Sequence, residues 1–229
     1  MARREGGDAL VRRTGSEERL VAYVSDLPSA LHGAAQHNIA NALAAGALAA
    51  GLGISEAVIG AALASFGRDP RDNPGRLEFH EVHGVRVLLD FGHNPHGVRA
   101  VQGPIRRLLA AVPGARLSVC VGQAGDRSDG DLIGLVTEIC ACGASQAWVR
   151  PLSGYERGRA SSETVRVLHQ AFIDCGLAPD AVSDVADEVD ALARAFAWAR
   201  PGDLLVHFVH LERDACSAWL AERAGAGPG

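Results

Sequence analysis

Residues 85–95 read Val-Arg-Val-Leu-Leu-Asp-Phe-Gly-His-Asn-Pro, and this stretch decides the fold class. An apolar run ends at Asp90, and Pro95 suits the first turn of a helix over 95–112. The same alternation continues to the C-terminus, with strands predicted at 115–121, 145–150, 181–184 and 203–209, and helices at 130–141, 161–175, 187–199 and 212–223. Such alternation predicts an α/β fold, in which right-handed crossovers build a mostly parallel sheet with helices on both faces.

A different pattern occupies the first third of the chain. Residues 8–14 and 18–24 suit two short strands around Gly15-Ser16. Two helices are predicted to follow, at 33–51 and at 55–66, the second capped by Ser55. The charged, breaker-rich stretch 68–75 is the predicted linker. We therefore divide the chain into a small, mainly helical portion (1–74), an α/β domain that opens with a hairpin of strands 76–82 and 85–90 (75–223), and a disordered tail (224–229).

The charged residues are unusual in kind rather than in number. The 229 residues include 22 basic and 27 acidic side chains, and every basic one is arginine. Without lysine the chain has no G-x-x-x-x-G-K-[ST] phosphate loop, no Schiff base and no lysine general base. Coding bias toward Ala, Gly and Arg is an alternative reason for the missing lysine. The net charge of −5 argues against nucleic-acid binding.

The apolar residues give no sign of a membrane protein. No run of 18 or more apolar residues exists, and no apolar segment follows the N-terminal Met1-Ala-Arg-Arg. The five cysteines are odd in number and stand mostly in apolar segments, which is typical of reduced core cysteines. We expect a cytoplasmic protein that binds no membrane.

Three polar, glycine-rich loops follow predicted strands, at 90–95, 122–130 and 150–159. In a parallel sheet ligands bind outside the carboxyl ends of the strands, so these loops are predicted to share one edge. Asp90 is placed to accept hydrogen bonds from a ribose diol, and His93 and Asn94 lie where a helix N-terminus favours phosphate. The alternative is a turn and helix cap without a ligand.

The other two loops carry arginines. Arg127, beside Asp126, suits bidentate binding of a carboxylate or phosphate, and Arg157 and Arg159 suit an anion. The alternatives are a capped helix with a surface ion pair, and a solvated arginine pair. No metal site is predicted, because the histidines spaced i, i+3 point to opposite faces of a strand and no paired C-x-x-C exists.

Five strings occur in order along the chain: His37-Asn-Ile-Ala-Asn-Ala-Leu-Ala-Ala45, Asn73-Pro-Gly-Arg76, Asp90-Phe-Gly-His-Asn-Pro95, Gly125-Asp-Arg-Ser-Asp129 and Pro201-Gly-Asp203. Together they resemble the Mur ligase superfamily, and within it the ligase half of cyanophycin synthetases, from about residue 20 to 210. The resemblance implies a Rossmann-like C-terminal domain after a remnant of the central domain. It also implies an activity, in which ATP phosphorylates a carboxylate and an amine attacks the acyl phosphate.

The resemblance assigns roles residue by residue. Asn38 and Asn41 match central-domain asparagines near the adenine, Arg76 matches a nucleotide-contacting arginine, and Asp90 matches the ribose-binding aspartate. His93 and Asn94 match the adjoining active-site loop. Asp126 and Arg127 match the Gly-Asp-Arg loop at the rim of the active site. Arg157 and Arg159 join the predicted active-site loops through their place after a predicted strand, not through the resemblance.

ATP and magnesium are the implied cofactors, yet the phosphate loop, magnesium ligands and carbamylated lysine of the family lie upstream of the matched part. We therefore expect a C-terminal portion or subunit of an amide ligase that does not turn over ATP alone and needs a partner carrying the phosphate loop. A homodimer through the apolar helices at 33–66 is the other expected partner. The alternatives are a non-catalytic module that binds a nucleotide or amino acid or serves dimerisation, and a truncated reading frame.

Overall fold

The computed structural model describes residues 1–225, apart from the side chain of Pro70. The chain divides into two compact units, Met1–Asn73 and a second that begins at Pro74. Within residues 1–225 no helix combines the length and the apolar character that a membrane crossing needs.

The N-terminal unit begins with a three-stranded antiparallel sheet, where the sequence predicted only a hairpin. Its strands are β1 (Ala2–Arg4), β2 (Gly7–Thr14) and β3 (Glu17–Tyr23). Two 3₁₀ turns follow, at Val24–Asp26 and Pro28–Ala30.

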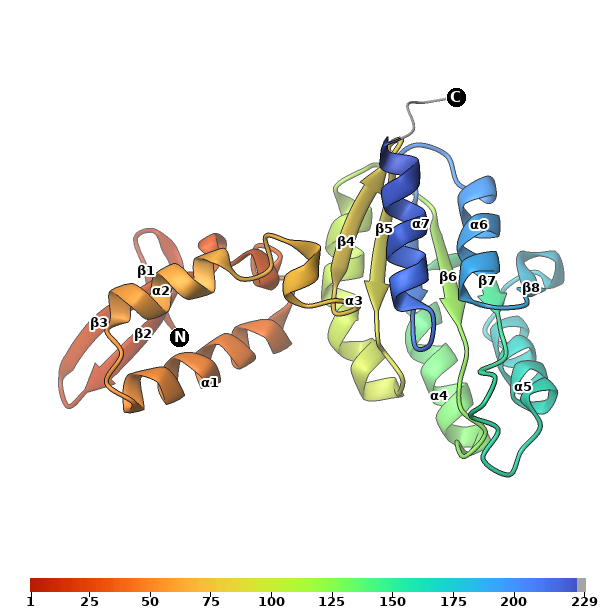
Figure 1. The fold of residues 1–229 in the computed structure, drawn as a ribbon, viewed down its shortest axis with the longest axis horizontal. Helices are drawn as coiled ribbons and strands as arrows, with labels where there is room; N and C mark the ends of the chain where they lie inside the picture. Colours follow the sequence, from red (N-terminus) through yellow and green to blue (C-terminus); the bar gives the residue numbers. More distant parts are fainter. Residues whose placement is uncertain (226–229) are drawn as a thin grey trace. The chain divides into compact units, whose positions relative to one another are not determined.

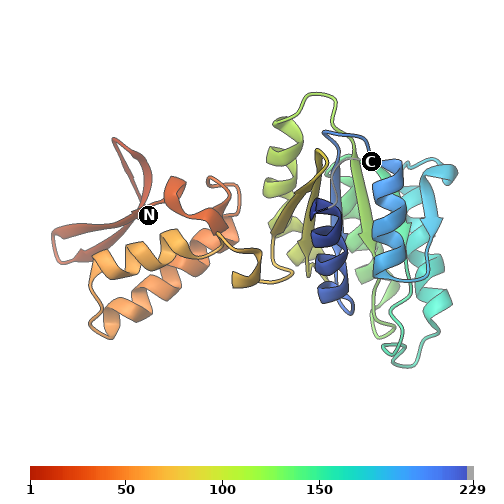
Figure 2. The same cartoon turned by 45° about the horizontal axis from the view of Figure 1, so that its top comes forward.

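The helices of this unit are α1 (Gln36–Gly51) and α2 (Glu56–Ser65), which lie side by side in Figures 1 and 2. The predicted start of α1 at Gly33 is wrong, because Leu31, His32 and Gly33 all have positive φ and so cannot continue a right-handed helix. Ser55 caps α2 as predicted, accepting a hydrogen bond from the backbone N–H of Val58 at 3.5 Å.

A small core joins the turns to α1, with Leu27, Ala30 and Ile39 at its centre. The apolar residues of α1 and α2 are unevenly covered. Ile39 and Ile59 are buried, whereas the side chains of Leu48 and Val58 are 73% and 59% exposed. The packing of α2 on β3 is close, since a Cβ on Gly60 would lie 2.1 Å from the carbonyl oxygen of Val21.

The C-terminal unit contains the predicted α/β sheet. Its six strands have the order β4-β5-β9-β6-β7-β8, and only β4 is antiparallel to its neighbour. The strands are β4 (Glu78–Val82), β5 (Val85–Asp90), β6 (Leu117–Val121), β7 (Ala144–Val149), β8 (Val182–Asp184) and β9 (Leu204–Phe208). The mostly parallel α/β fold expected from the sequence is confirmed.

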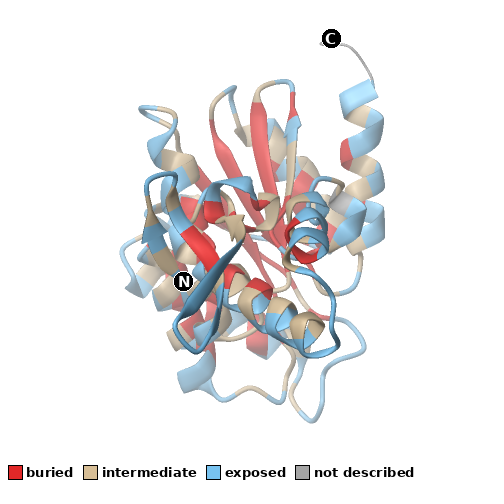
Figure 3. Ribbon diagram, turned by 90° about the vertical axis from the view of Figure 1, so that its left-hand side faces the viewer, coloured by how far each residue is buried: buried red, intermediate tan, exposed pale blue. Residues whose placement is uncertain are grey.

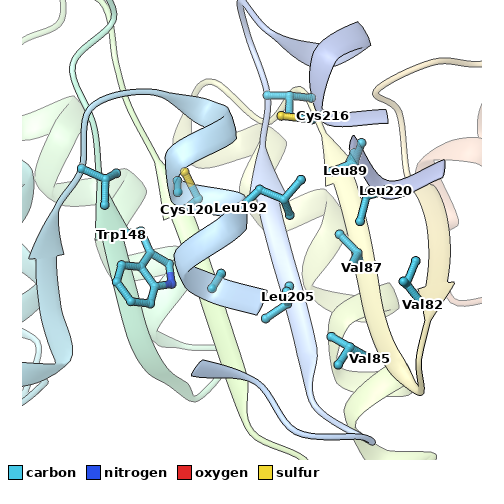
Figure 4. Packing of buried hydrophobic residues seen from close by; sticks show 14 residues of the cluster. Val82, Val85, Val87, Leu89, Cys120, Trp148, Leu192, Leu205, Cys216 and Leu220 are labelled. Atoms are coloured by element: carbon cyan, nitrogen blue, oxygen red, sulfur yellow. The ribbon is translucent and has the colours of Figure 1, made fainter. Parts of the chain in front are cut away.

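Helices cover both faces of this sheet (Figures 1 and 2). They are α3 (Pro95–Ala110), α4 (Asp129–Cys140), α5 (Ser161–Asp174), α6 (Glu188–Trp198) and α7 (Arg213–Gly225), with a 3₁₀ turn at Pro179–Ala181 before β8. Figure 4 shows one core face, where Val87 and Leu205 of the sheet meet Leu192 of α6 and Leu220 of α7. In Figure 3 the buried segments run along these strands.

Two details correct the sequence predictions. The predicted tail starts at 224, but α7 continues through Gly225; residues 226–229 lie outside the described part. All five cysteines are free, yet only Cys120, Cys142 and Cys216 are buried, whereas Cys175 is exposed.

Candidate functional site

The carboxyl ends of the five parallel strands lie together at one end of the sheet, which we call its carboxyl edge. Asp90 pairs with Phe208, Cys120 with His207, and Val121 with Val149. This register places the three predicted loops on the same edge. A fourth loop, 209–212 after β9, joins them and was not singled out from the sequence.

Asp90 lies at this edge, and its carboxylate accepts hydrogen bonds from two backbone N–H groups. Its side chain is 6% exposed; Oδ1 accepts a hydrogen bond from the N–H of Gly92 at 2.8 Å, and Oδ2 accepts one from the N–H of Leu77 at 3.0 Å. Leu77 has a φ of 51°, a strained conformation for a branched residue. Asp90 therefore stabilises the turn that carries Arg76, and its contact with a ribose stays a prediction.

Glu78 is a second carboxylate that holds the same turn. Its Oε2 accepts the N–H of Gly75 at 2.7 Å, and its Oε1 accepts His80 Nε2 at 2.7 Å and Ser217 Oγ at 2.8 Å. Burial by itself would raise the pKa of Glu78, but these hydrogen bonds outweigh it and hold the pKa below its usual value. An ionised Glu78 thus supports the segment on which Arg76 stands.

Arg76 is exposed, and its guanidinium lies over the ring of Phe91, 4.6 Å from the centroid. Phe91 in turn contacts the rings of His93 at 5.3 Å and His210 at 5.0 Å. A cation over an aromatic face is attracted by the ring quadrupole. The aromatic cluster therefore orients a positive charge at the carboxyl edge of the sheet.

Asn94 has both a structural and a local polar role. Its Oδ1 caps α3 by accepting the N–H of Gly97 at 2.7 Å. Its Nδ2 donates to Nε2 of His93 at 3.2 Å, so Nε2 is the accepting nitrogen of this imidazole. The capping alternative is observed, and the ligand role of His93 and Asn94 stays a prediction.

A small cavity separates the beginnings of α3 and α4. Its volume is about 20 Å³, enough for one water molecule, and its polar lining consists of His93, Asn94, Gln123, Arg127 and the carboxylate Asp131. Gln123 is 4% exposed. Within the described residues, Gln123 Nε2 and Arg127 Nε are buried and have no hydrogen-bond partner. The α3 N-terminus and the two unpaired donors favour an oxyanion, whereas Asp131 in the first turn of α4 opposes one.

The remaining predicted residues of this rim are already paired. Arg157 donates to Asp126 Oδ2 at 2.7 Å, and this hydrogen bond lowers the pKa of Asp126. Arg159 lies 2.6 Å from Asp129 Oδ1. The loops are tightly joined, since a Cβ on Gly125 would lie 1.9 Å from the carbonyl oxygen of Glu156. Arg157 and Arg159 therefore bind the neighbouring loop, and of the three rim arginines only Arg127 lines the small cavity.

Asn38 and Asn41 belong to the N-terminal unit. Asn38 Nδ2 donates to the carbonyl oxygen of Ser29 at 2.8 Å, and Asn41 is exposed on α1. The predicted role of these two asparagines near the adenine stays a prediction.

Comparison with known proteins settles the family. Residues 75–208 match the family described as "Mur ligase, glutamate ligase domain". The chain belongs to the Mur ligase family. It is 32% identical over 183 residues to a cyanophycin synthetase of Synechocystis sp., covering 80% of this chain and 20% of that protein. It is 33% identical over 186 residues to a UDP-N-acetylmuramate–L-alanine ligase of Roseiflexus castenholzii, covering 74% of this chain and 33% of that protein.

A solved structure shows the same fold. E. coli FolC in complex with DHPP and ADP has a TM-score of 0.53 and 22% identity, covering 74% of this chain and 36% of that one. This Mur ligase family chain thus spans a fifth of the length of the first of these two curated relatives and about a third of the second.

The family membership leaves several polar residues of this Mur ligase chain without a role. Gln123, Arg150, Glu188 and His210 were not selected from the sequence. The only available signal was their place beside the ends of predicted strands, which many structural residues share.

Proposed function

We propose that this chain is the C-terminal portion, or a separate subunit, of an ATP-dependent carboxylate–amine ligase. It supplies the adenine and ribose side of the nucleotide site and the domain that closes on it. The proposal rests on family membership and on a fold relative that was solved with ADP. A cytoplasmic location is part of the proposal, and the five free cysteines fit a reducing compartment.

The observation that carries the proposal is the pair of unpaired donors on Gln123 and Arg127, beside the α3 N-terminus. A buried donor without a partner is costly, and an oxyanion supplies the missing acceptor. The oxygen of a nucleotide phosphate and that of a substrate carboxylate both satisfy this chemistry. Arg76, oriented on Phe91, adds positive charge at the same edge.

The side chains of this chain suit a magnesium ion less well than they suit an oxyanion. Among residues 1–225 no group of three or more His, Cys, Asp and Glu side chains is arranged to hold a metal ion. In the proposed ligase the ion and the nucleotide phosphates are therefore bound chiefly by a partner that carries a phosphate loop, since this chain has no lysine.

Calorimetric titration with ADP and ATP tests nucleotide binding. We expect both to bind, and Arg127→Gln to weaken binding about tenfold because a charge-assisted hydrogen bond is lost. Arg166→Gln on α5 is the matched control and should bind as the wild type does. If neither nucleotide gives a heat of binding, the proposal that this chain forms part of the nucleotide site is wrong.

A phosphate-release assay tests catalysis. We expect no release from ATP, magnesium and amino acids with this chain alone, and release once a partner with a phosphate loop is added. Phosphate release by the chain alone would contradict the proposal that a partner supplies the phosphate loop. Phosphate release that does not increase on mixing would contradict the proposed ligase function.

The second candidate is a non-catalytic binding or dimerisation module. The observation that favours it is a set of exposed apolar residues at the end of α1, in the following turn and at the start of α2, which we call the α1–α2 patch: Leu48, Leu52, Ile54 and Val58. Leu52 is 83% exposed. An exposed patch of this kind typically marks an interface. Either a second copy of this chain or the ligase partner would cover it.

A further inference from the structure

Arg150 is a large, fully buried cation directly after β7. It is 1% exposed, and its Nη2 donates to the carbonyl oxygen of Phe208 at 3.1 Å and to Nδ1 of His210 at 2.8 Å. The same Nη2 lies 2.5 Å from Oε1 of Glu188, also 1% exposed. One guanidinium therefore joins the end of β7, the end of β9 and the start of α6.

Glu188 gathers the backbone of the loop after β9. Its Oε1 accepts the N–H groups of His210 at 2.6 Å and Leu211 at 3.1 Å, and its Oε2 accepts that of Glu212 at 2.7 Å. The contact is reciprocal, because Glu212 Oε2 accepts the N–H of Glu188 at 2.8 Å. Three N–H groups and one arginine thus satisfy a buried carboxylate, as its charge requires.

The pair reaches the candidate site through aromatic rings. His210, bonded to Arg150, meets Phe91 edge-on, with ring centroids 5.0 Å apart and planes at 69°. Phe91 carries the guanidinium of Arg76. Arg150 also presses on the loop after β6, since a Cβ on Gly122 would lie 2.7 Å from its Nη1.

We propose that Arg150 and Glu188 are positioning residues, which hold loop 209–212 and, through His210 and Phe91, aim Arg76 at the ligand. The nucleotide side of this inference rests on the proposed function. A purely structural ion pair would stabilise the fold without affecting ligand binding. The two roles therefore predict different ADP affinities for a variant from which both charges are removed together.

The test is the double variant Arg150→Met/Glu188→Gln. Removing one charge leaves the other buried and unpaired, whereas replacing both removes that penalty. We expect the double variant to melt within a few degrees of the wild type but to bind ADP at least about tenfold more weakly. The side-chain amide introduced by Glu188→Gln carries its own N–H donors, which would oppose the backbone N–H of Glu212, so the loop loses its anchor.

The matched control is Arg116→Met/Asp203→Asn. Arg116 lies 3.0 Å (Nε to Oδ2) from Asp203, which is 1% exposed, and both precede strands at the opposite edge of the sheet. This variant should bind ADP as the wild type does. Wild-type affinity in the Arg150/Glu188 double variant, or an equal loss in the control, would overturn the positioning role.

Hydrogen exchange gives a readout that does not depend on nucleotide binding. In the full chain, the amides of 210–212 and 91–93 should exchange about tenfold faster in the Arg150/Glu188 variant and unchanged in the control. Unchanged exchange in both segments would overturn the proposal. If the wild type binds no ADP, the proposed function fails, while this exchange measurement still decides whether the pair positions the loops.

Discussion

His207 and His210 are two imidazoles held neutral at the carboxyl edge of the sheet. Burial, together with the charge of nearby Arg150, lowers the pKa of each to about 3. Their Nε2 atoms are buried without a partner among the described residues. Protonation would place a second positive charge beside an arginine in a dry environment, so the fold excludes it.

Acid should therefore destabilise the fold through these two groups. Because their folded pKa lies below the unfolded value near 6.5, the stability they contribute is complete above that value and is lost as the pH falls toward 3. Each contributes a slope of about 1.4 kcal/mol per pH unit in that window. Denaturant unfolding from pH 7 to 4 measures it.

The substitution His207→Leu tests the assignment. It should reduce the number of protons taken up on unfolding between pH 7 and 4 by about one, and so flatten the pH dependence of stability. Equal slopes for the wild type and His207→Leu would show that this imidazole does not titrate on unfolding.

Asn94, directly before helix α3, caps the helix and contacts His93. Asn94→Ala removes the acceptor for the N–H of Gly97 and should destabilise the protein by about 1 kcal/mol. Asn94→Asp keeps the capping oxygen but loses the donor to His93. We expect thermal melting to recover in Asn94→Asp. If the contact with His93 matters for the ligand, ADP affinity should not recover with it.

Helix α2 packs so closely on β3 that Gly60 allows no side chain. Gly60→Ala would place a Cβ 2.1 Å from the carbonyl oxygen of Val21 and should destabilise the N-terminal unit by about 1–3 kcal/mol. The control is Gly51→Ala at the end of α1, where nothing lies within 4 Å, and it should stabilise by about 0.5–1 kcal/mol. Thermal denaturation that moves in the same direction for both variants would refute the contact.

The chain as a whole exposes the α1–α2 patch. If a second copy covers it, light scattering after size exclusion should show a dimer, and Leu52→Asp with Val58→Asp should give a monomer because charges oppose burial. Ile133→Asp, at an isolated apolar position that is 48% exposed, is the control and should leave the assembly unchanged. A monomeric wild type would contradict the homodimer, and the ligase partner would then be the proposed occupant of the α1–α2 patch.

Much of the second unit followed from local pattern. The strand ending at Asp90 and the turn at His83-Gly84 depend on neighbours in sequence, so periodicity and turn chemistry predicted them. The cap at Asn94 was the alternative to a ligand role. The third strand of the N-terminal sheet was missed, since Ala2–Arg4 is short and owes its conformation to pairing with β2. Arg157 and Arg159 were placed at the correct edge, but their partners were not foreseen.

The sequence by itself determined the α/β class and the Mur ligase resemblance, because alternating periodicity and ordered strings are properties of the chain. Only the tertiary structure decided which charges are engaged. Arg150 and Glu188 lie far apart in sequence and meet because β7, β9 and α6 converge at one sheet edge. Burial at that edge turns an ordinary arginine and glutamate into an anchor for the loop after β9. The same burial leaves Gln123 and Arg127 with donors that only a ligand or water can satisfy.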